Sequence, residues 1–305
     1  MNSAVCTLFE GDYHLGVGAL ANSLHRFGFR GIMHVGYRGS LPSWMVGEKA
    51  NPGSIASVPC GLSFRFHELD TPWHLTNYKP LFIKRAFDSD PTIDAIFYFD
   101  PDIVIKCQWT YYEEWVQAGI ALVEEIATGG MPYNHPIRRR WLEVAKTLNI
   151  RCHPVFSQYF NAGFIGLNRS CEHYLDVWGA IISFLPKYGV DLSRFMQSNR
   201  PDPFTSADQD ALNIVAMAAE PHLSTMGPEG MDFVPGGFTM SHAVGPKPWR
   251  KNYLLSAFNG MKPSLADKAF WDNTEAPIRV FSESQIFWRR FTLQLANLIG
   301  RFYGR

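Results

Sequence analysis

The first forty residues alternate between two patterns of apolar positions. Residues 4–9 and 32–37 form short apolar runs, which indicate buried strands. Between them, apolar residues recur at helical spacing over residues 14–27, and Gly28 follows as a natural helix C-cap. A strand, a helix and a second strand predict the start of a doubly wound α/β sheet, in which ligands bind beyond the carboxyl ends of the strands.

The same two patterns continue along the chain. They predict strands at residues 95–99, 119–123 and 164–168, and helices at 77–87, 111–115, 136–148, 174–188 and from 205 to just before Pro221. Residues 38–77 are rich in Gly, Pro, Ser and Trp, and we expect loops with short strands there. We therefore expect one main α/β domain over residues 1–255 and a helical extension over residues 256–305.

Two carboxylates follow the apolar run at 95–99. Asp100 and Asp102 are one residue apart, so an extended chain would place both on one face at the exposed end of a strand. Pro101 stiffens the backbone between them. Two close carboxylates repel unless a cation lies between them, and Mn²⁺ or Mg²⁺ prefers oxygen ligands. Since Asp-Pro-Asp is also ordinary turn chemistry, the tripeptide alone leaves a turn and a metal site open.

The loop over residues 240–249 adds two candidate residues. His242 is a candidate metal ligand, although a lone histidine is more often structural. Lys247 lies between two prolines, so it cannot belong to a regular helix interior. Together they indicate one metal ligand and one cation for a phosphate.

Other charged groups have structural explanations of equal weight. Lys79 and Lys84 could face a phosphate, but a solvated helix face explains each as well. Asp208 and Asp210 suit the positive end of the helix that they open, and Ser206 with Gln209 fits a capping box.

Composition excludes some function classes. Formal net charge is zero over 305 residues, which gives no basic field for nucleic acid. Five widely spaced cysteines without a CxxC motif argue against a disulfide framework or a zinc knuckle and suit a reducing cytosol. The N-terminus lacks a signal-peptide pattern, and no apolar run is long enough to span a membrane. We expect a cytoplasmic protein.

One alternative is an NADP-dependent oxidoreductase. Residues 16–21 match the GxGxxA dinucleotide fingerprint, and Arg38 after the second strand could face a 2′-phosphate. The fingerprint requires its first glycine directly after the strand, whereas residues 10–15 intervene here. The glycines more simply allow the helix to pack closely.

Four motifs in order carry a resemblance to a known family. They are Asp100-Pro101-Asp102, Phe160-Asn161-Ala162-Gly163, Asp208-Gln209-Asp210 and His242-Ala-Val-Gly245-Pro-Lys247-Pro-Trp249. The set resembles the family-8 glycosyltransferases, such as glycogenin and lipopolysaccharide galactosyltransferases, over about residues 4–252. The last motif is one residue shorter than the family's His-x-x-Gly-x-x-Lys-Pro-Trp, because only Pro246 separates Gly245 from Lys247.

The resemblance implies a GT-A fold, a Rossmann-like mixed sheet, and retaining transfer of a hexose from a nucleotide sugar such as a UDP-sugar. It implies Mn²⁺ or Mg²⁺ held by Asp100, Asp102 and His242. The acceptor would be a saccharide or a lipid. The implied roles of the other residues are a donor-binding group of Thr7, Asp12, Tyr13, Asn161, Gly163, Gly245 and Lys247, a catalytic group of Asp208, Gln209 and Asp210, and a weaker sugar contact at Glu125. We add Lys79 and Lys84 to the donor-binding candidates because of their place on the helix before the carboxylates, and not because of the resemblance. A nucleotide-sugar-binding protein without turnover is the second alternative.

The C-terminal segment, residues 282–305, mixes apolar, aromatic and basic residues at helical spacing. Such a helix can lie on an anionic membrane surface. It can equally dock its apolar side on the main domain, and the sequence leaves both open.

Overall fold

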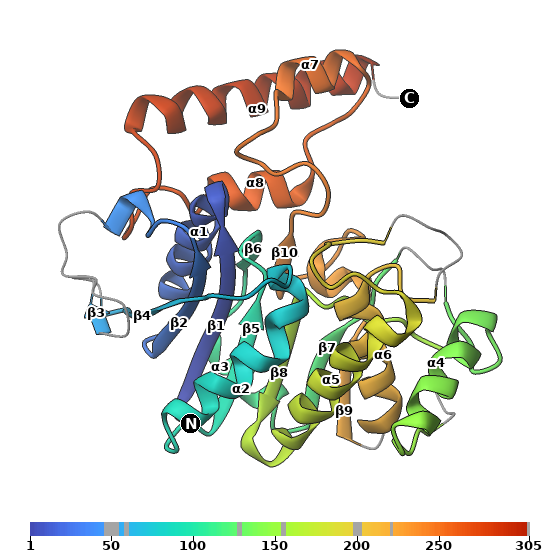
Figure 1. The fold of residues 1–305 in the computed structure, drawn as a ribbon. Coiled ribbons are helices and arrows are strands. Elements are labelled where there is room, and N and C mark those ends of the chain that lie inside the picture. The colour runs from blue at the N-terminus through green and yellow to red at the C-terminus, as the bar shows by residue number, and fades with distance from the viewer. Residues whose placement is uncertain are drawn as a thin grey trace.

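An eight-stranded mixed sheet runs through the molecule in the computed structural model (Figure 1). The structure describes residues 1–45, 55–57, 61–126, 130–153, 157–197, 203–219 and 222–303. The strand order is β3-β4-β2-β1-β5-β8-β7-β9. The strands are β1 (Ser3–Glu10), β2 (Ile32–Arg38), β3 (Ile55–Ser57), β4 (Ser63–Glu68), β5 (Ala95–Phe99), β7 (Ile120–Val123), β8 (Phe164–Asn168) and β9 (Leu223–Met226).

Two strands of this sheet run against the others. Strand β3 is antiparallel to β4 at the edge, and β8 is antiparallel to both β5 and β7 inside the sheet. The remaining pairs are parallel. Because β8 runs the other way, its amino end meets the carboxyl ends of β5 and β7, and the turn that precedes β8 joins the same edge of the sheet.

A separate two-stranded ribbon stands beside this edge. It pairs β6 (Ile103–Ile105) with β10 (Met240–His242) in antiparallel register, with Ile103 opposite His242. No local pattern indicates this pairing, because the two segments lie far apart in the chain.

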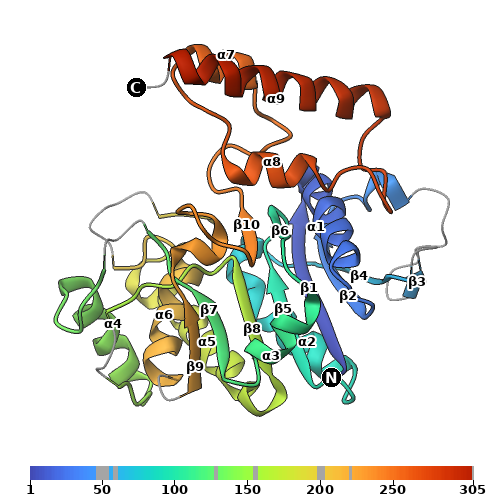
Figure 2. The ribbon, with the colours of Figure 1, turned by 180° about the vertical axis from the view of Figure 1, so that it is seen from behind.

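Helices cover both faces of the sheet, as a doubly wound fold requires. They are α1 (His14–Arg26), α2 (Lys79–Ser89), α3 (Trp109–Trp115), α4 (Pro136–Thr147), α5 (His173–Phe184) and α6 (Ala207–Ala219). Alternate residues of β1 supply two apolar clusters: Cys6 and Leu8 pack with α2, α5 and α6, and Val5 and Phe9 pack with α1 and α3. Helices α2 and α5 lie in front in Figure 1, and α3 lies in front in Figure 2.

Three C-terminal helices stand above α1 and the small ribbon (Figure 1). They are α7 (Tyr253–Phe258), α8 (Leu265–Trp271) and α9 (Glu283–Tyr303). A third apolar cluster joins Trp271 and Leu293 to Ala19 of α1 and Val104 of β6. The expected domain boundary after residue 255 falls inside α7 and stays a prediction. Among the described residues, no helix is long and apolar enough to cross a membrane.

Candidate functional site

Asp100 and Asp102 lie on a tight turn between β5 and β6. The Ile103 amide donates to the Asp100 carbonyl at 3.0 Å, which closes the turn. The expectation that extended chain would align the two carboxylates is therefore wrong. The turn nevertheless brings both carboxylates to one place, because β6 leaves the sheet to pair with β10.

The β6–β10 ribbon supplies the third member of this group. His242 lies opposite Ile103, and the Ala243 amide donates to the Asp102 carbonyl at 3.0 Å. The imidazole Nε2 lies 3.4 Å from Asp102 Oδ1. Ligand atoms of Asp100, Asp102 and His242 all lie within 4.8 Å of one another. The three residues predicted as metal ligands thus come together.

Two glycines allow this close approach. A Cβ on Gly16 of α1 would lie 2.0 Å from the Pro101 carbonyl oxygen. A Cβ on Gly163 would lie 2.6 Å from Cε1 of His242. Gly16 therefore packs against the Asp-Pro-Asp turn, and Gly163 leaves room for the imidazole.

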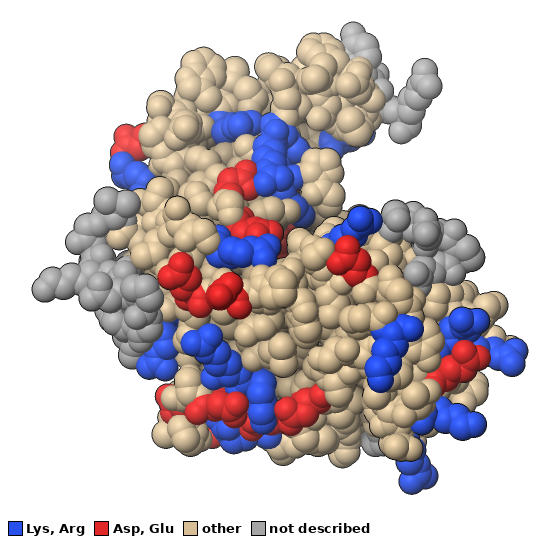
Figure 3. Space-filling model, in the orientation of Figure 1, with Lys and Arg blue, Asp and Glu red and all other residues tan. Residues whose placement is uncertain are grey.

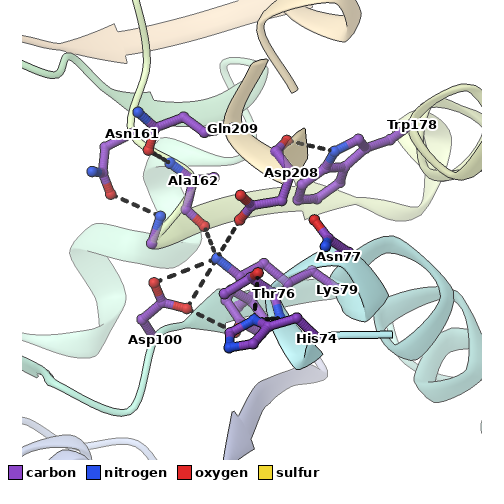
Figure 4. Close-up of polar contacts among 12 residues, drawn as sticks. His74, Thr76, Asn77, Lys79, Asp100, Asn161, Ala162, Trp178, Asp208 and Gln209 are labelled. Atoms are coloured by element: carbon purple, nitrogen blue, oxygen red, sulfur yellow. Dashed lines mark hydrogen bonds and ion pairs between the residues drawn. The ribbon is translucent and has the colours of Figure 1, made fainter. Parts of the chain in front are cut away.

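A buried lysine connects this group to α6 (Figure 4). The Lys79 ammonium lies 3.1 Å from Asp100 and 3.0 Å from Asp208, and it donates to the Ala162 carbonyl at 2.9 Å. These three acceptors match its three donors. Burial alone would lower the pKa of Lys79, but Asp100 and Asp208 outweigh it and raise that pKa. The Tyr98 hydroxyl also donates to Asp100, at 2.8 Å.

The start of α6 contributes two of its three predicted residues. Asp208 faces Lys79, and the Gln209 side-chain oxygen accepts from the Ala162 amide at 3.1 Å. Asp210 points elsewhere, where it accepts from the Tyr159 hydroxyl and from the Ser206 amide. The capping box expected between Ser206 and Gln209 is wrong, because Asp210 holds the Ser206 amide instead.

The turn before β8 is held from both sides. Asn161 accepts from the Gly163 amide at 2.7 Å and donates to the Glu125 carboxylate. Asn213 of α6 bonds both the amide and the carbonyl of Phe160. The sequence did not single out Asn213, but it lies one helical turn after Gln209, on the same face of α6.

Lys247 lies against the other carboxylate of the pair. Its ammonium bonds Asp102 and donates to the Ala243 carbonyl at 3.0 Å. Burial alone would raise the pKa of Asp102, but His242 and Lys247 beside it outweigh that effect and lower the pKa. Gly245 adopts a left-handed φ of +80° just before Lys247. The shortened motif therefore still brings Lys247 to the predicted metal ligands.

Tyr13 stands next to this lysine. It lies in η1 (Gly11–Tyr13), a short 3₁₀ helix at the end of β1, and its half-buried ring is 5.8 Å from the Lys247 ammonium and 5.3 Å from the Arg250 guanidinium. Asp12 binds Arg250 and accepts from the Trp249 indole at 3.0 Å. The Arg250 hydrogen bond is the main cause that lowers the pKa of Asp12. Asp12 therefore ties the β1 end to the loop that carries Lys247.

Two predicted donor-binding residues lie outside this group. Lys84 is on another side of α2, where it pairs with Glu172 of α5 at 2.6 Å. Thr7 is fully buried inside β1, and its hydroxyl has no hydrogen-bond partner among the described residues. Neither side chain contacts Asp100 or Asp102.

The NADP alternative does not fit the geometry. Gly16 and Gly18 lie inside α1, where a Cβ on Gly18 would meet Val280 at 2.6 Å. They serve close packing and form no phosphate-binding turn at the helix start. Arg38 pairs with Glu10 at 2.6 Å and donates to the Thr71 carbonyl, so its charge is already satisfied.

The donor set fits a divalent cation. Two carboxylates suit Mn²⁺ and Mg²⁺, and an imidazole favours Mn²⁺ between them. The buried Nδ1 of His242 has no hydrogen-bond partner among the described residues, so the ring is free to present a nitrogen to an ion. Charged side chains of both signs gather where the C-terminal helices overhang the main body (Figure 3).

Comparison with known proteins bears on the fold. No protein-family model matches the chain, and no curated protein matches it. The WbbM bifunctional glycosyltransferase superposes with a TM-score of 0.55 at 19% identity, over 93% of this chain and 51% of that one. The glycosyltransferase GlyE of Streptococcus pneumoniae TIGR4 gives 0.51 at 14% identity, over 96% and 64%. The chain thus spans about half to two thirds of these proteins.

At such low identities the likeness concerns the fold alone. The predicted fold class, a doubly wound mixed sheet of GT-A type, is confirmed.

Proposed function

We propose that the protein is a metal-dependent glycosyltransferase, which moves a hexose from a UDP-sugar to a saccharide or lipid acceptor. The observation that carries this proposal is the group of Asp100, Asp102 and His242, whose ligand atoms lie within 4.8 Å of one another. They lie at the sheet edge where α/β folds bind ligands, in a fold that known glycosyltransferases share. The order of the four motifs supports a relation to family 8.

The residues around this group suit a nucleoside diphosphate. Asp100, Asp102 and His242 would hold Mn²⁺ or Mg²⁺, which when bound neutralises the charge that develops on the departing diphosphate. Lys247 would add a second positive charge to the same oxygens, with Gly245 leaving the backbone accessible. The ring of Tyr13 lies beside Lys247 and would stack on the base.

The donor sugar would lie over the turn before β8. Asn161 and Asp208 border this turn and offer acceptors and donors for sugar hydroxyls. The Gln209 side-chain oxygen lies at the same turn, because it accepts from Ala162, and would face the anomeric carbon. A partial negative charge there stabilises oxocarbenium character as the sugar leaves.

The surroundings of the two α6 carboxylates favour a front-face route to retained configuration. Asp208 is engaged by the Lys79 ammonium, which weakens it as a nucleophile. Both oxygens of Asp210 are engaged, because they accept from the Tyr159 hydroxyl and the Ser206 amide. A double displacement needs a carboxylate free to attack, whereas a front-face route needs none.

A panel of nucleotide sugars with Mn²⁺, read by nucleotide release with and without saccharide or lipid acceptors, tests the proposal. We expect release from one UDP-hexose, loss of that release in Asp102→Ala, and an α-linked product by NMR. Asp176→Ala, which removes an exposed carboxylate of α5, should keep full turnover. UDP-sugar binding without any release across the panel would instead favour the non-catalytic alternative.

We further propose that the C-terminal helices contact a membrane surface, at the inner face if the protein is cytoplasmic as its cysteine pattern suggests. Helix α9 buries Ile286, Leu293 and Ala296, and the last two join an apolar cluster with Tyr253 of α7 and Trp271 of α8, so docking describes one side of the helix. The opposite side is exposed and apolar. It consists of Phe287, Trp288, Phe291 and Leu298, each 46–63% exposed. The surface over α7 and α9 shows few charged side chains in Figure 3.

Two arginines of α9 have hydrogen-bond partners within the protein. Arg289 donates to the Lys251 carbonyl at 2.6 Å, and Arg290 donates to the Trp271 carbonyl at 2.8 Å. Because these two arginines are engaged, we assign the proposed contact mainly to the apolar side chains. Insertion of the four half-exposed apolar side chains would contribute about 1 kcal/mol each, which corresponds to reversible binding.

Vesicle flotation tests this contact. We expect the protein to float with phosphatidylcholine vesicles, with little dependence on salt, and the triple variant Phe287→Ser, Trp288→Ser, Phe291→Ser to stay behind. Tyr133→Ser, an exposed aromatic change elsewhere, should float like the wild type. Failure of the wild type to float, or a dimer that the triple variant abolishes, would contradict the proposal.

A further inference from the structure

Three carboxylates at the candidate metal site, Asp100, Asp102 and Asp208, each have an ammonium partner. Lys247 bonds Asp102, and both side chains are largely buried, with exposed fractions of 14% and 4%. Lys79 lies between Asp100 and Asp208. The three carboxylates and the two lysines together have a net charge of −1.

This charge count disfavours a bare divalent cation. Lys247 already bonds Asp102, so a cation that coordinates Asp102 comes close to the Lys247 ammonium. The two positive charges repel, and screening is weak because the site is buried. Adding the ion alone would turn the net charge from −1 to +1. A diphosphate brings negative oxygens that can bind both the cation and the lysine, so it removes the conflict.

The two lysines differ in their freedom to respond. Lys79 is 1% exposed and bound by three acceptors, which come from the turn before β8, from α6 and from the Asp100 turn. Lys247 follows the exposed Val244, Gly245 and Pro246. Besides Asp102, the one hydrogen-bond acceptor that it has among the described residues is a carbonyl of its own loop. Lys247 is therefore the partner able to transfer from Asp102 to an incoming phosphate.

We infer that Lys247 competes with the divalent cation for Asp102, and that a nucleoside diphosphate relieves this competition by drawing Lys247 to its phosphates. Cation and nucleotide then bind cooperatively, each raising the affinity for the other by the same factor. Lys247 acts here as a positioning residue, which selects the cation–diphosphate complex over the bare ion. The inference rests on the proposed function for its ligand, a nucleoside diphosphate.

Mn²⁺ titrations followed by electron paramagnetic resonance, with and without UDP, test this without any turnover. In the wild type we expect UDP to tighten Mn²⁺ binding by at least about tenfold. In Lys247→Met we expect bare Mn²⁺ to bind about tenfold more tightly than in the wild type, and UDP in the presence of Mn²⁺ to bind more weakly. Lys146→Met, which removes an exposed lysine of α4, should change neither affinity.

Opposite changes in the two affinities distinguish competition from a structural role. If Lys247→Met and a second variant, Lys247→Gln, fold with wild-type circular dichroism and bind bare Mn²⁺ no more tightly, the inference is overturned. Failure of UDP to tighten Mn²⁺ binding in the wild type would also overturn it. The proposed function is judged separately, by nucleotide release from UDP-sugars, and the bare Mn²⁺ comparison does not depend on that result.

Discussion

Lys79→Met is the substitution whose effect the structure defines most fully. The lysine side chain is 2% exposed and lies about 3 Å from Asp208, which is 5% exposed, and from Asp100, which is 20% exposed. Methionine has a similar length, so loss of packing is small. Removing one partner of a buried ion pair costs about 3–5 kcal/mol, because the carboxylate left behind has no counter-charge. In a chain of this size that corresponds to a melting temperature about 5–10 °C lower.

Thermal and urea unfolding, together with a second substitution, separate charge from packing. Adding Asp208→Asn to Lys79→Met removes the more buried of the two carboxylates left without a counter-charge, so we expect it to restore much of the lost stability. A double variant that is no more stable than Lys79→Met alone would refute the ion-pair explanation.

Two further predictions concern parts of the fold that support the site. His34 and His67 face each other with ring nitrogens 3.2 Å apart, and burial lowers their pKa values to about 3 and about 4. The unfolded chain therefore binds more protons below pH 6.5, and each histidine should reduce the free energy of unfolding by about 2 kcal/mol between pH 7 and pH 5. In urea titrations, a His34→Gln, His67→Gln variant should lose this part of the pH dependence of the free energy of unfolding. An unchanged pH dependence in the variant would contradict the prediction. Gly16→Ala should destabilise the protein by about 1–3 kcal/mol and weaken Mn²⁺ binding with UDP, because its Cβ would meet the Pro101 carbonyl. Gly179→Ala in α5 has room for a Cβ and should be neutral or stabilising in the same melting assay, so equal effects of the two changes would contradict the packing argument.

The repeating elements of the fold could be predicted because their apolar spacing is local. Strands β1, β2 and β5 and helices α1, α5 and α6 lie within a few residues of the predicted ranges. Pairings between distant segments could not be predicted in this way. The antiparallel position of β8 between β5 and β7, and the pairing of β6 with β10, depend on which strands can still accept a neighbour after the rest of the sheet has formed.

The candidate site likewise depends on contacts between segments that are far apart in the chain. Asp100, Asp102, His242 and Lys247 were predicted together only through the order of motifs, and the structure shows that the β6–β10 ribbon joins them. Nothing local to either segment indicates that pairing.

Helical geometry could have refined two predictions. Residues five apart are turned by about 140° around a helix, so Lys79 and Lys84 of α2 point in different directions. Residues two apart are turned by about 200°, so Asp208 and Asp210 of α6 point in nearly opposite directions. The structure shows both separations.

The most direct test of the account is an anomalous difference map from crystals grown with Mn²⁺ and UDP. The account predicts one manganese peak within coordination distance of Asp100, Asp102 and His242, with diphosphate oxygens beside it and the base next to Tyr13. A nucleotide bound elsewhere on the molecule, or a manganese peak away from these three residues, would contradict it.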